Sequence, residues 1–196
     1  MSKVGSRSLA ALSFTLGRLQ FDPASAVPAA ITAPGQSQAV NVRAVAIPLK
    51  TYYRMDASLP AGGTLAWPLS DVVAPEGLTD RRIGIFGWKG EAETPILVPV
   101  RVSQGSSASS RAPVLIIQAS FDAQKVKWRW GPFTDGRCGA LGAWSDAITK
   151  PVTAGWPIAI DLSSIPPGTH CFDAAAQSGV STEWSPLKLR LDIPKP

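Results

Sequence analysis

The residues that could perform catalysis or bind a metal are few in this sequence. The chain holds one histidine, His170, and two cysteines, Cys138 and Cys171. Nucleophilic catalysis through histidine needs a neighbouring Ser or Cys and an acid; Asp173 lies nearby, but the sequence contains no G-x-S-x-G elbow. A zinc site of four Cys and His ligands cannot be completed from three residues, and adjacent residues of a strand point to opposite faces. We therefore expect no catalytic residue, no metal and no cofactor.

The sequence also lacks the patterns for a phosphate-binding loop and for glycoside hydrolysis. The glycine-rich segment 84–90 has neither the G-x-G-x-x-G spacing before a helix nor the P-loop spacing, so it predicts a strand that another backbone approaches closely. Glycoside hydrolysis needs a matched pair of carboxylates, whereas the 14 acidic residues lie mostly in expected turns without a distinguishing context. An enzyme is the third of three functional hypotheses, after assembly and carbohydrate binding.

The two cysteines leave two alternatives open. Cys138 lies in a glycine-rich loop and Cys171 on an expected strand. A disulfide between them would close a loop of about 30 residues and stabilise the fold by about 3–4 kcal/mol in the chain-entropy treatment. Two free thiols, one of them buried, are the other alternative.

The elements that would position these residues are strands. The 196 residues include 18 prolines and 17 glycines, a density that leaves few uninterrupted windows for a helical bundle. Residues 39–104 alternate between apolar and polar side chains and carry prolines where strands bend or form sheet edges. We predict an all-β protein with a small antiparallel β domain at 39–104, a Ser-rich linker at 105–112 and a second β domain at 113–196.

The second β domain contains the clearest alternation. In segment 125–133, Val126, Trp128 and Trp130 share one face, which predicts a core contact for both tryptophans. Lys125, Lys127 and Arg129 share the other face, which we expect to contact solvent.

The sequence KWRW, followed by DLSSIPPGTH, a strand ending in QSG, and EWSPLKLRLDI, resembles an immunoglobulin-like or fibronectin type III-like bacterial or phage module. The resemblance covers residues 113–194, and His170 stands where such modules carry a tyrosine before the late strand. It implies a β-sandwich that binds, spaces or assembles.

Residues 1–38 predict an extended arm followed by a Pro-rich linker. Four leucines recur at helical spacing, which predicts a short amphipathic helix that docks on a neighbouring subunit: Leu9, Leu12, Leu16 and Leu19. A secretory signal peptide is the alternative for residues 1–30, because Lys3 and Arg7 precede a short apolar run. No apolar run approaches the ~20 residues of a membrane span.

The charge pattern argues against a dedicated nucleic-acid protein. The formal net charge is +5, but three of the 19 basic residues lie within the first 20 positions, which hold no acid, so the body is nearly neutral. Nucleic acid would therefore be bound only by non-specific phosphate contacts of the basic arm. Charged residues make up 17% of the chain, against about 25% in ordinary globular proteins, which suits a surface that packs on other subunits.

These patterns predict a non-enzymatic assembly protein. We expect a bacteriophage virion component (a capsid decoration, head–tail or tail protein) that forms a homo-oligomer within a larger assembly and binds neighbouring subunits through its arm. Three tryptophans near loops or strand ends are candidate interface anchors: Trp144, Trp156 and Trp184. The alternative is a secreted or cell-surface bacterial protein for adhesion or carbohydrate binding, in which these tryptophans stack on sugars.

Overall fold

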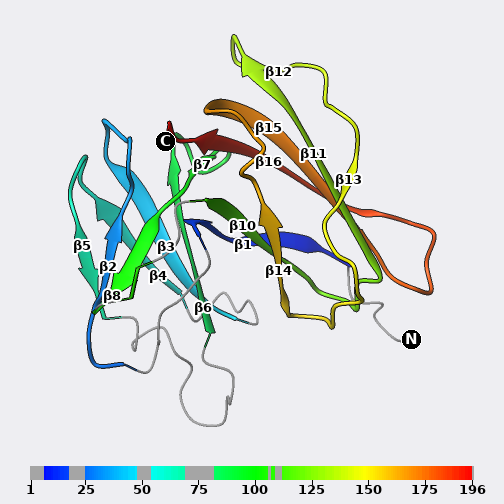
Figure 1. The fold of residues 1–196 in the computed structure, drawn as a ribbon, viewed down its shortest axis with the longest axis horizontal. Coiled ribbons are helices and arrows are strands. Elements are labelled where there is room, and N and C mark those ends of the chain that lie inside the picture. Colours follow the sequence, from blue (N-terminus) through cyan, green and yellow to red (C-terminus); the bar gives the residue numbers. More distant parts are fainter. Residues whose placement is uncertain are drawn as a thin grey trace.

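The computed structural model describes residues 7–17, 25–47, 54–68, 82–105, 107–108 and 112–195. Within these ranges the chain forms sixteen strands and no helix (Figure 1), so the predicted all-β class is confirmed. It follows that the described part of the chain contains no helix long and apolar enough to cross a membrane.

We call β1 together with the strands that follow residue 112 the C-terminal half, and β2 to β9 the N-terminal half. The C-terminal half consists of two sheets packed around one core. The first is a three-stranded antiparallel sheet with the order β1 (Leu9–Leu16), β10 (Pro113–Ala119) and β14 (Pro157–Asp161). The second contains the antiparallel neighbours β11 (Lys125–Thr134), β15 (Gly168–Gln177) and β16 (Ser185–Ile193). Their facing side chains form a cluster that includes Phe14, Leu115, Ile160 and Phe172, each at most 2% exposed. This arrangement is the one expected of a β-sandwich.

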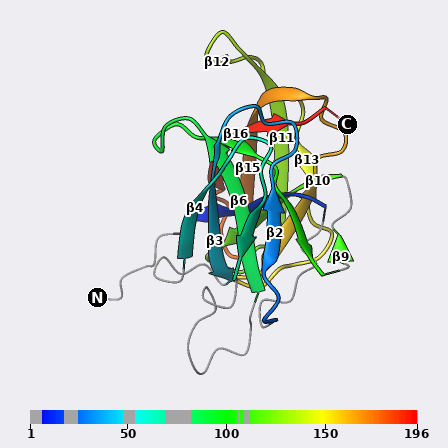
Figure 2. The same ribbon diagram turned by 90° about the vertical axis from the view of Figure 1, so that its left-hand side faces the viewer.

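Beyond β11 the second sheet ends in two short strands, β12 (Arg137–Cys138) and β13 (Ser145–Asp146), which both pair with β11. The β11–β12 turn places Asp135 at φ 51° and Gly136 at φ 74°, the left-handed pair that a two-residue Asp-Gly hairpin requires. The tip of this hairpin extends beyond the rest of the body in two perpendicular views (Figures 1 and 2).

The N-terminal half has a second core between two further layers. One layer is the sheet β5 (Leu65–Trp67), β2 (Ala29–Thr32), β8 (Arg101–Gln104) and β9 (Ser107–Ala108). The other is formed by β4 (Arg54–Leu59), β3 (Val40–Ile47), β6 (Arg82–Lys89) and β7 (Ile96–Val98). Ile31, Val42 and Ile85 are fully buried between these layers.

The two halves share one sheet. Strand β16 pairs in parallel with β7 through Arg190↔Ile96 and Leu191↔Leu97, so nine strands from both sides of the Ser-rich segment form one continuous sheet. Pro99, which cannot donate to a strand ladder, separates β7 from β8 at the point where the chain leaves this sheet for the other layer. The segment predicted as a linker at 105–112 thus lies between segments that contribute to different cores, but it does not separate two independent sheets.

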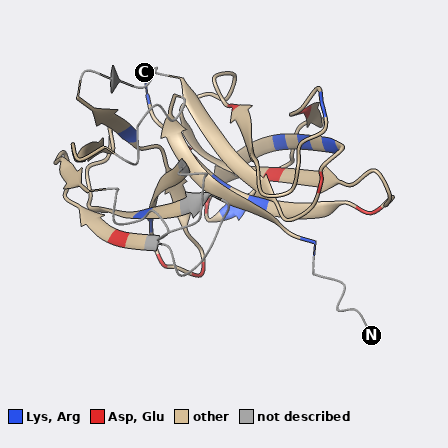
Figure 3. Cartoon of the chain, turned by 90° about the horizontal axis from the view of Figure 1, so that it is seen from below, with Lys and Arg blue, Asp and Glu red and all other residues tan. Residues whose placement is uncertain are grey.

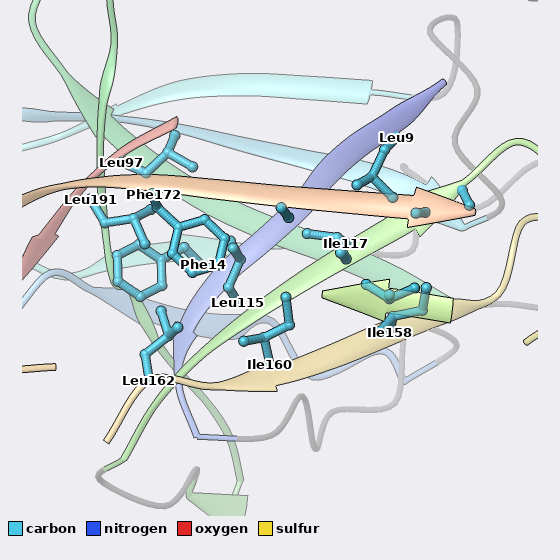
Figure 4. Close-up of a cluster of buried hydrophobic side chains, with 14 of the residues drawn as sticks. Leu9, Phe14, Leu97, Leu115, Ile117, Ile158, Ile160, Leu162, Phe172 and Leu191 are labelled. Carbon is cyan, nitrogen blue, oxygen red and sulfur yellow. The ribbon is translucent and has the colours of Figure 1, made fainter. Parts of the chain in front are cut away.

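The prediction of a docking arm is wrong for residues 9–16. They form β1, which pairs with β10 along its length and supplies Leu9 and Phe14 to the C-terminal core (Figure 4). A bulge between Ala11 and Ser13 shifts the alternation, so that Phe14 shares the face of Leu9 and Ala11 while Leu12 lies on the opposite face. There Leu12 joins a small cluster with Val45 and Ile116 that fills the space between the two halves.

The leucine spacing was misleading because β1 is buried on both faces, and such strands lack a polar face that would reveal their period of two. Its polar residues are satisfied internally, since the Ser13 hydroxyl donates to the Ile85 carbonyl at 2.8 Å and the Thr15 hydroxyl donates to the Gly17 carbonyl at 2.6 Å. The Pro-rich segment predicted as a linker likewise contains β2, in which Ile31 is fully buried.

Candidate binding surface

The alternation of β11 determines where its charged and aromatic residues lie. Val126 is buried, and Trp128 stacks on Phe172 with ring centroids 5.5 Å apart, so this face of the strand packs on the core as predicted. Lys127 and Arg129 consequently lie on the outer face of the sheet. Charged positions are sparse over the whole body, most of which is drawn tan in Figure 3.

Two exposed tryptophans flank Lys127. Its ammonium nitrogen lies 3.8 Å from the ring centroid of Trp184 and 4.5 Å from that of Trp144. The guanidinium carbon of Arg129 lies 4.3 Å from the centroid of Trp144, and its Nη2 atom pairs with Asp173 at 3.2 Å. We call Lys127, Arg129, Trp144 and Trp184 the tryptophan–cation surface. Cation–π contacts at such partly exposed positions contribute about 0.5–1 kcal/mol each and order the long basic side chains.

Trp144 reaches this position because the chain between β12 and β13 follows the edge of β11. The amide of Gly139 donates to the Pro132 carbonyl at 2.9 Å, and the amide of Gly142 donates to the Trp130 carbonyl at 2.8 Å. A Cβ added to Gly131 would lie 2.5 Å from the Ala140 carbonyl oxygen, so glycine permits the close approach. The segment predicted as a long loop therefore serves as an edge of the sheet.

A disulfide fixes the start of this segment. Cys138 and Cys171 are bonded, with their Cα atoms 5.7 Å apart, so the disulfide is the alternative that the structure contains. Because both thiols are oxidised, the three-residue metal site considered from the sequence has no free thiolate in this state. Within the described residues no group of three or more His, Cys, Asp or Glu side chains could hold a metal ion.

His170 is buried and contacts other residues of the protein. It is 7% exposed, its ring packs edge-on against Trp130 at 4.9 Å between centroids, and its Nε2 atom lies 2.8 Å from the Pro166 carbonyl oxygen. Its Nδ1 atom is buried without a hydrogen-bond partner. Asp173, the acid noted beside it in the sequence, points to the other face of the sheet and pairs with Arg129.

The N-terminal half contains a second contact between a cation and an aromatic ring, but the charge of this cation, Arg43, is already paired with Asp56. The guanidinium of Arg43 lies 5.2 Å from the ring centroid of Trp88 and forms two hydrogen bonds with Asp56, at 2.6 and 2.9 Å. The hydrogen bond to Asp56 raises the pKa of Arg43 above its usual value, and the charge of Asp56 acts in the same direction. By contrast, Lys127 forms no ion pair with any residue that the structure describes, so its charge is available to a partner.

The structure brings together only some of the predicted interface residues. Trp144 and Trp184, which are 39% and 36% exposed, meet at Lys127, whereas Trp156, 52% exposed, precedes β14 and is not part of this surface. Leu9, Leu12 and Leu16 are buried in the chain's own core and cannot contact a neighbour, and Leu19 lies outside the described residues. The sequence did not reveal that Lys127 and Arg129 join the tryptophans, although their alternation on one strand face was the available signal.

A scan against protein-family models finds no matching family, and searches of curated proteins and of solved structures find no significant match.

Proposed function

We propose that this chain is a non-enzymatic structural protein that assembles with other subunits, as a bacteriophage virion component forming a homo-oligomer within a larger assembly. The observation that carries the proposal is the tryptophan–cation surface, on which two exposed Trp rings and two basic groups of β11 lie together. The leucines that were expected to dock the arm on a neighbour do not supply the contact, because Leu9, Leu12 and Leu16 are buried within this chain.

The composition of this surface is that of a protein interface. Tryptophan and arginine are enriched among the residues that contribute most to binding, whereas lysine is depleted at interfaces in general. Here the Trp rings restrain Lys127 and Arg129 before a partner arrives, which reduces the side-chain entropy lost on binding. The exposed part of the rings supplies apolar area, and Lys127 supplies an unneutralised charge for an acidic group of the partner.

The strand order of the C-terminal half supports the finer assignment to an immunoglobulin-like module. Immunoglobulin domains have strands A, B and E side by side in one sheet and G, F and C in the other. The orders β1-β10-β14 and β16-β15-β11 correspond to A-B-E and G-F-C, with the chain running through them in the same sequence. In this assignment β1 is the first strand and the N-terminal half is an insertion between strands A and B.

Trp128 is half-buried and stacks on Phe172, which agrees with that assignment, because a tryptophan on strand C that packs on the core is typical of immunoglobulin domains. Modules of this kind are used for binding, spacing and assembly, so the fold analogy favours assembly without choosing the partner.

Sedimentation velocity of the full chain over a range of concentrations tests the proposal. We expect concentration-dependent association of the native protein and a loss of association in the double variant Trp144→Ser/Trp184→Ser with little change in its melting temperature. The matched control is Trp156→Ser, which removes an exposed tryptophan outside the surface and should still associate. A native chain that stays monomeric at every concentration contradicts the homo-oligomer, and equal association of both variants contradicts the surface. The virion setting requires that the intact chain be found in purified phage particles.

A secreted adhesion or carbohydrate-binding protein is the second candidate. The disulfide agrees with it as it agrees with a virion surface, because such bonds persist in extracellular and periplasmic compartments and on virions. Exposed tryptophans also stack on sugars. The cations beside Trp144 and Trp184 cover part of the ring surface that a sugar would use, which favours a protein partner. Saturable binding of oligosaccharides by a monomer, lost in the double variant, would establish this second function instead.

A further inference from the structure

A hollow lies where the two halves of the molecule meet, away from the tryptophan–cation surface. Its volume is about 430 Å³, and its walls come from the ends of β1 and β16, the start of β10, the β2–β3 turn, strand β8 and the β14–β15 connection. Most of the lining is apolar and includes Pro34, Pro113, Ile165 and Ile193. Prolines offer rigid apolar surface without a backbone N–H, so this wall is shaped in advance for a hydrocarbon group.

The charges on the hollow have one sign. Arg101 and Lys195 line it, and its lining contains no Asp or Glu. The Nε atom of Arg101 is buried without a hydrogen-bond partner, and no ion pair joins its guanidinium to any described carboxylate. A partly buried arginine without an ion-pair partner among the described residues is costly, so an anion that reaches its guanidinium from the hollow would stabilise it.

The side-chain carboxylates closest in sequence to the lining, Asp192 and Asp161, have other partners. Asp192, beside Ile193, pairs with Lys89 at 2.6 Å. Asp161, two residues before Ser163 of the lining, accepts a hydrogen bond from the amide of Ser163 at 2.8 Å. Neither acid forms an ion pair with Arg101, so the positive charge of the hollow remains for a ligand.

We propose that this hollow binds a carboxylate that carries an apolar body, such as a short fatty acid or an aromatic acid. The carboxylate lies at Arg101 and Lys195, where a planar guanidinium can bind both oxygens. The hydrocarbon part lies against the prolines and isoleucines of the wall. A neutral apolar molecule would leave Arg101 unpaired, and inorganic phosphate would leave the apolar wall uncovered, so the combination of both features selects this ligand class.

Hexanoate and benzoate are the probes, and titration followed by amide NMR of the full chain is the measurement. We expect saturable shifts at Leu16, Ile165 and Ile193 with millimolar or tighter affinity. Hexanamide, which has the same hydrocarbon body without the charge, should bind about 10-fold more weakly or worse, because charge-assisted hydrogen bonds to arginine are lost. Inorganic phosphate tests the anion alone and should also bind more weakly.

Two variants test which basic side chain of the hollow binds the carboxylate. Arg101→Gln should weaken hexanoate binding about 10-fold or more, and Lys195→Gln, outside any strand, should weaken it to a smaller extent without risk to the fold. The matched control is Arg137→Gln on the projecting β11–β12 hairpin, which should bind hexanoate as the native protein does. The proposal is overturned if hexanoate causes no shifts, if hexanamide binds equally well, if phosphate binds as tightly as hexanoate, or if Lys195→Gln and Arg101→Gln both bind as the native chain does.

Discussion

The substitution Phe14→Ala tests whether β1 belongs to the core. Phe14 is fully buried, faces Leu115 in the strand register and lies in the cluster that contains Phe172. Removing a buried phenylalanine side chain costs about 3–5 kcal/mol, because apolar contacts are lost and a cavity remains. For a chain of this length each kcal/mol lowers the melting temperature by about 2–4 °C, so we expect a decrease of roughly 6–20 °C.

Equilibrium unfolding in urea, followed by tryptophan fluorescence, measures this free energy directly. The control is Val180→Ala, since Val180 is 89% exposed and its truncation should change stability by less than about 0.5 kcal/mol. The slope of the transition should be unchanged if the variant loses stability without altering the unfolded state. A cost below about 1 kcal/mol for Phe14→Ala would refute the reasoning, because a residue on a detached arm would behave in that way.

Two further predictions concern the contacts that hold the layers together. A Cβ added to Gly84 would lie 2.6 Å from the backbone oxygen of Leu12, so Gly84→Ala should lower the unfolding free energy by about 1–3 kcal/mol, as overpacking does. Gly142→Ala, whose added Cβ meets only a carbonyl oxygen at 3.4 Å, should cost clearly less in the same urea titration, and equal costs would contradict the close approach. Reduction of the disulfide between Cys138 and Cys171, separated by 33 positions, should lower the unfolding free energy by about 3–4 kcal/mol. An unchanged urea midpoint after complete reduction would disprove that contribution.

Strands with one buried face could be predicted from the sequence. The alternation of β11 identified the core position of Trp128, and the Asp135-Gly136 pair carries the chemistry of the tight hairpin that follows. The prolines of segment 39–104 predict strand bends and sheet edges, and in the structure one of them, Pro99, lies between β7 and β8, where the chain passes from one sheet to another. These signals are local, because neither the period-two alternation of a strand nor the residue types of a tight turn depend on which strand is the neighbour in the sheet.

What could not be predicted depends on distant partners. Leu9 and Leu12 are buried on opposite faces of β1 because the sheet that contains β15 and β16 covers one face and β6 covers the other, and no local pattern contains that information. The tryptophan–cation surface forms because β11 and the start of β16 flank β15, which brings Lys127 to Trp184 across 57 positions of sequence. Pairings over such separations are decided by the topology of the whole sheet.

Hydrogen–deuterium exchange of the full chain, compared between dilute and concentrated samples, tests the central claim that the tryptophan–cation surface is an assembly contact. Association should slow exchange in β13 and at the start of β16, around Trp144 and Trp184, and leave the distant strand β4 unchanged. Protection confined to other strands, or identical exchange at all concentrations in a protein that remains monomeric, would contradict the account.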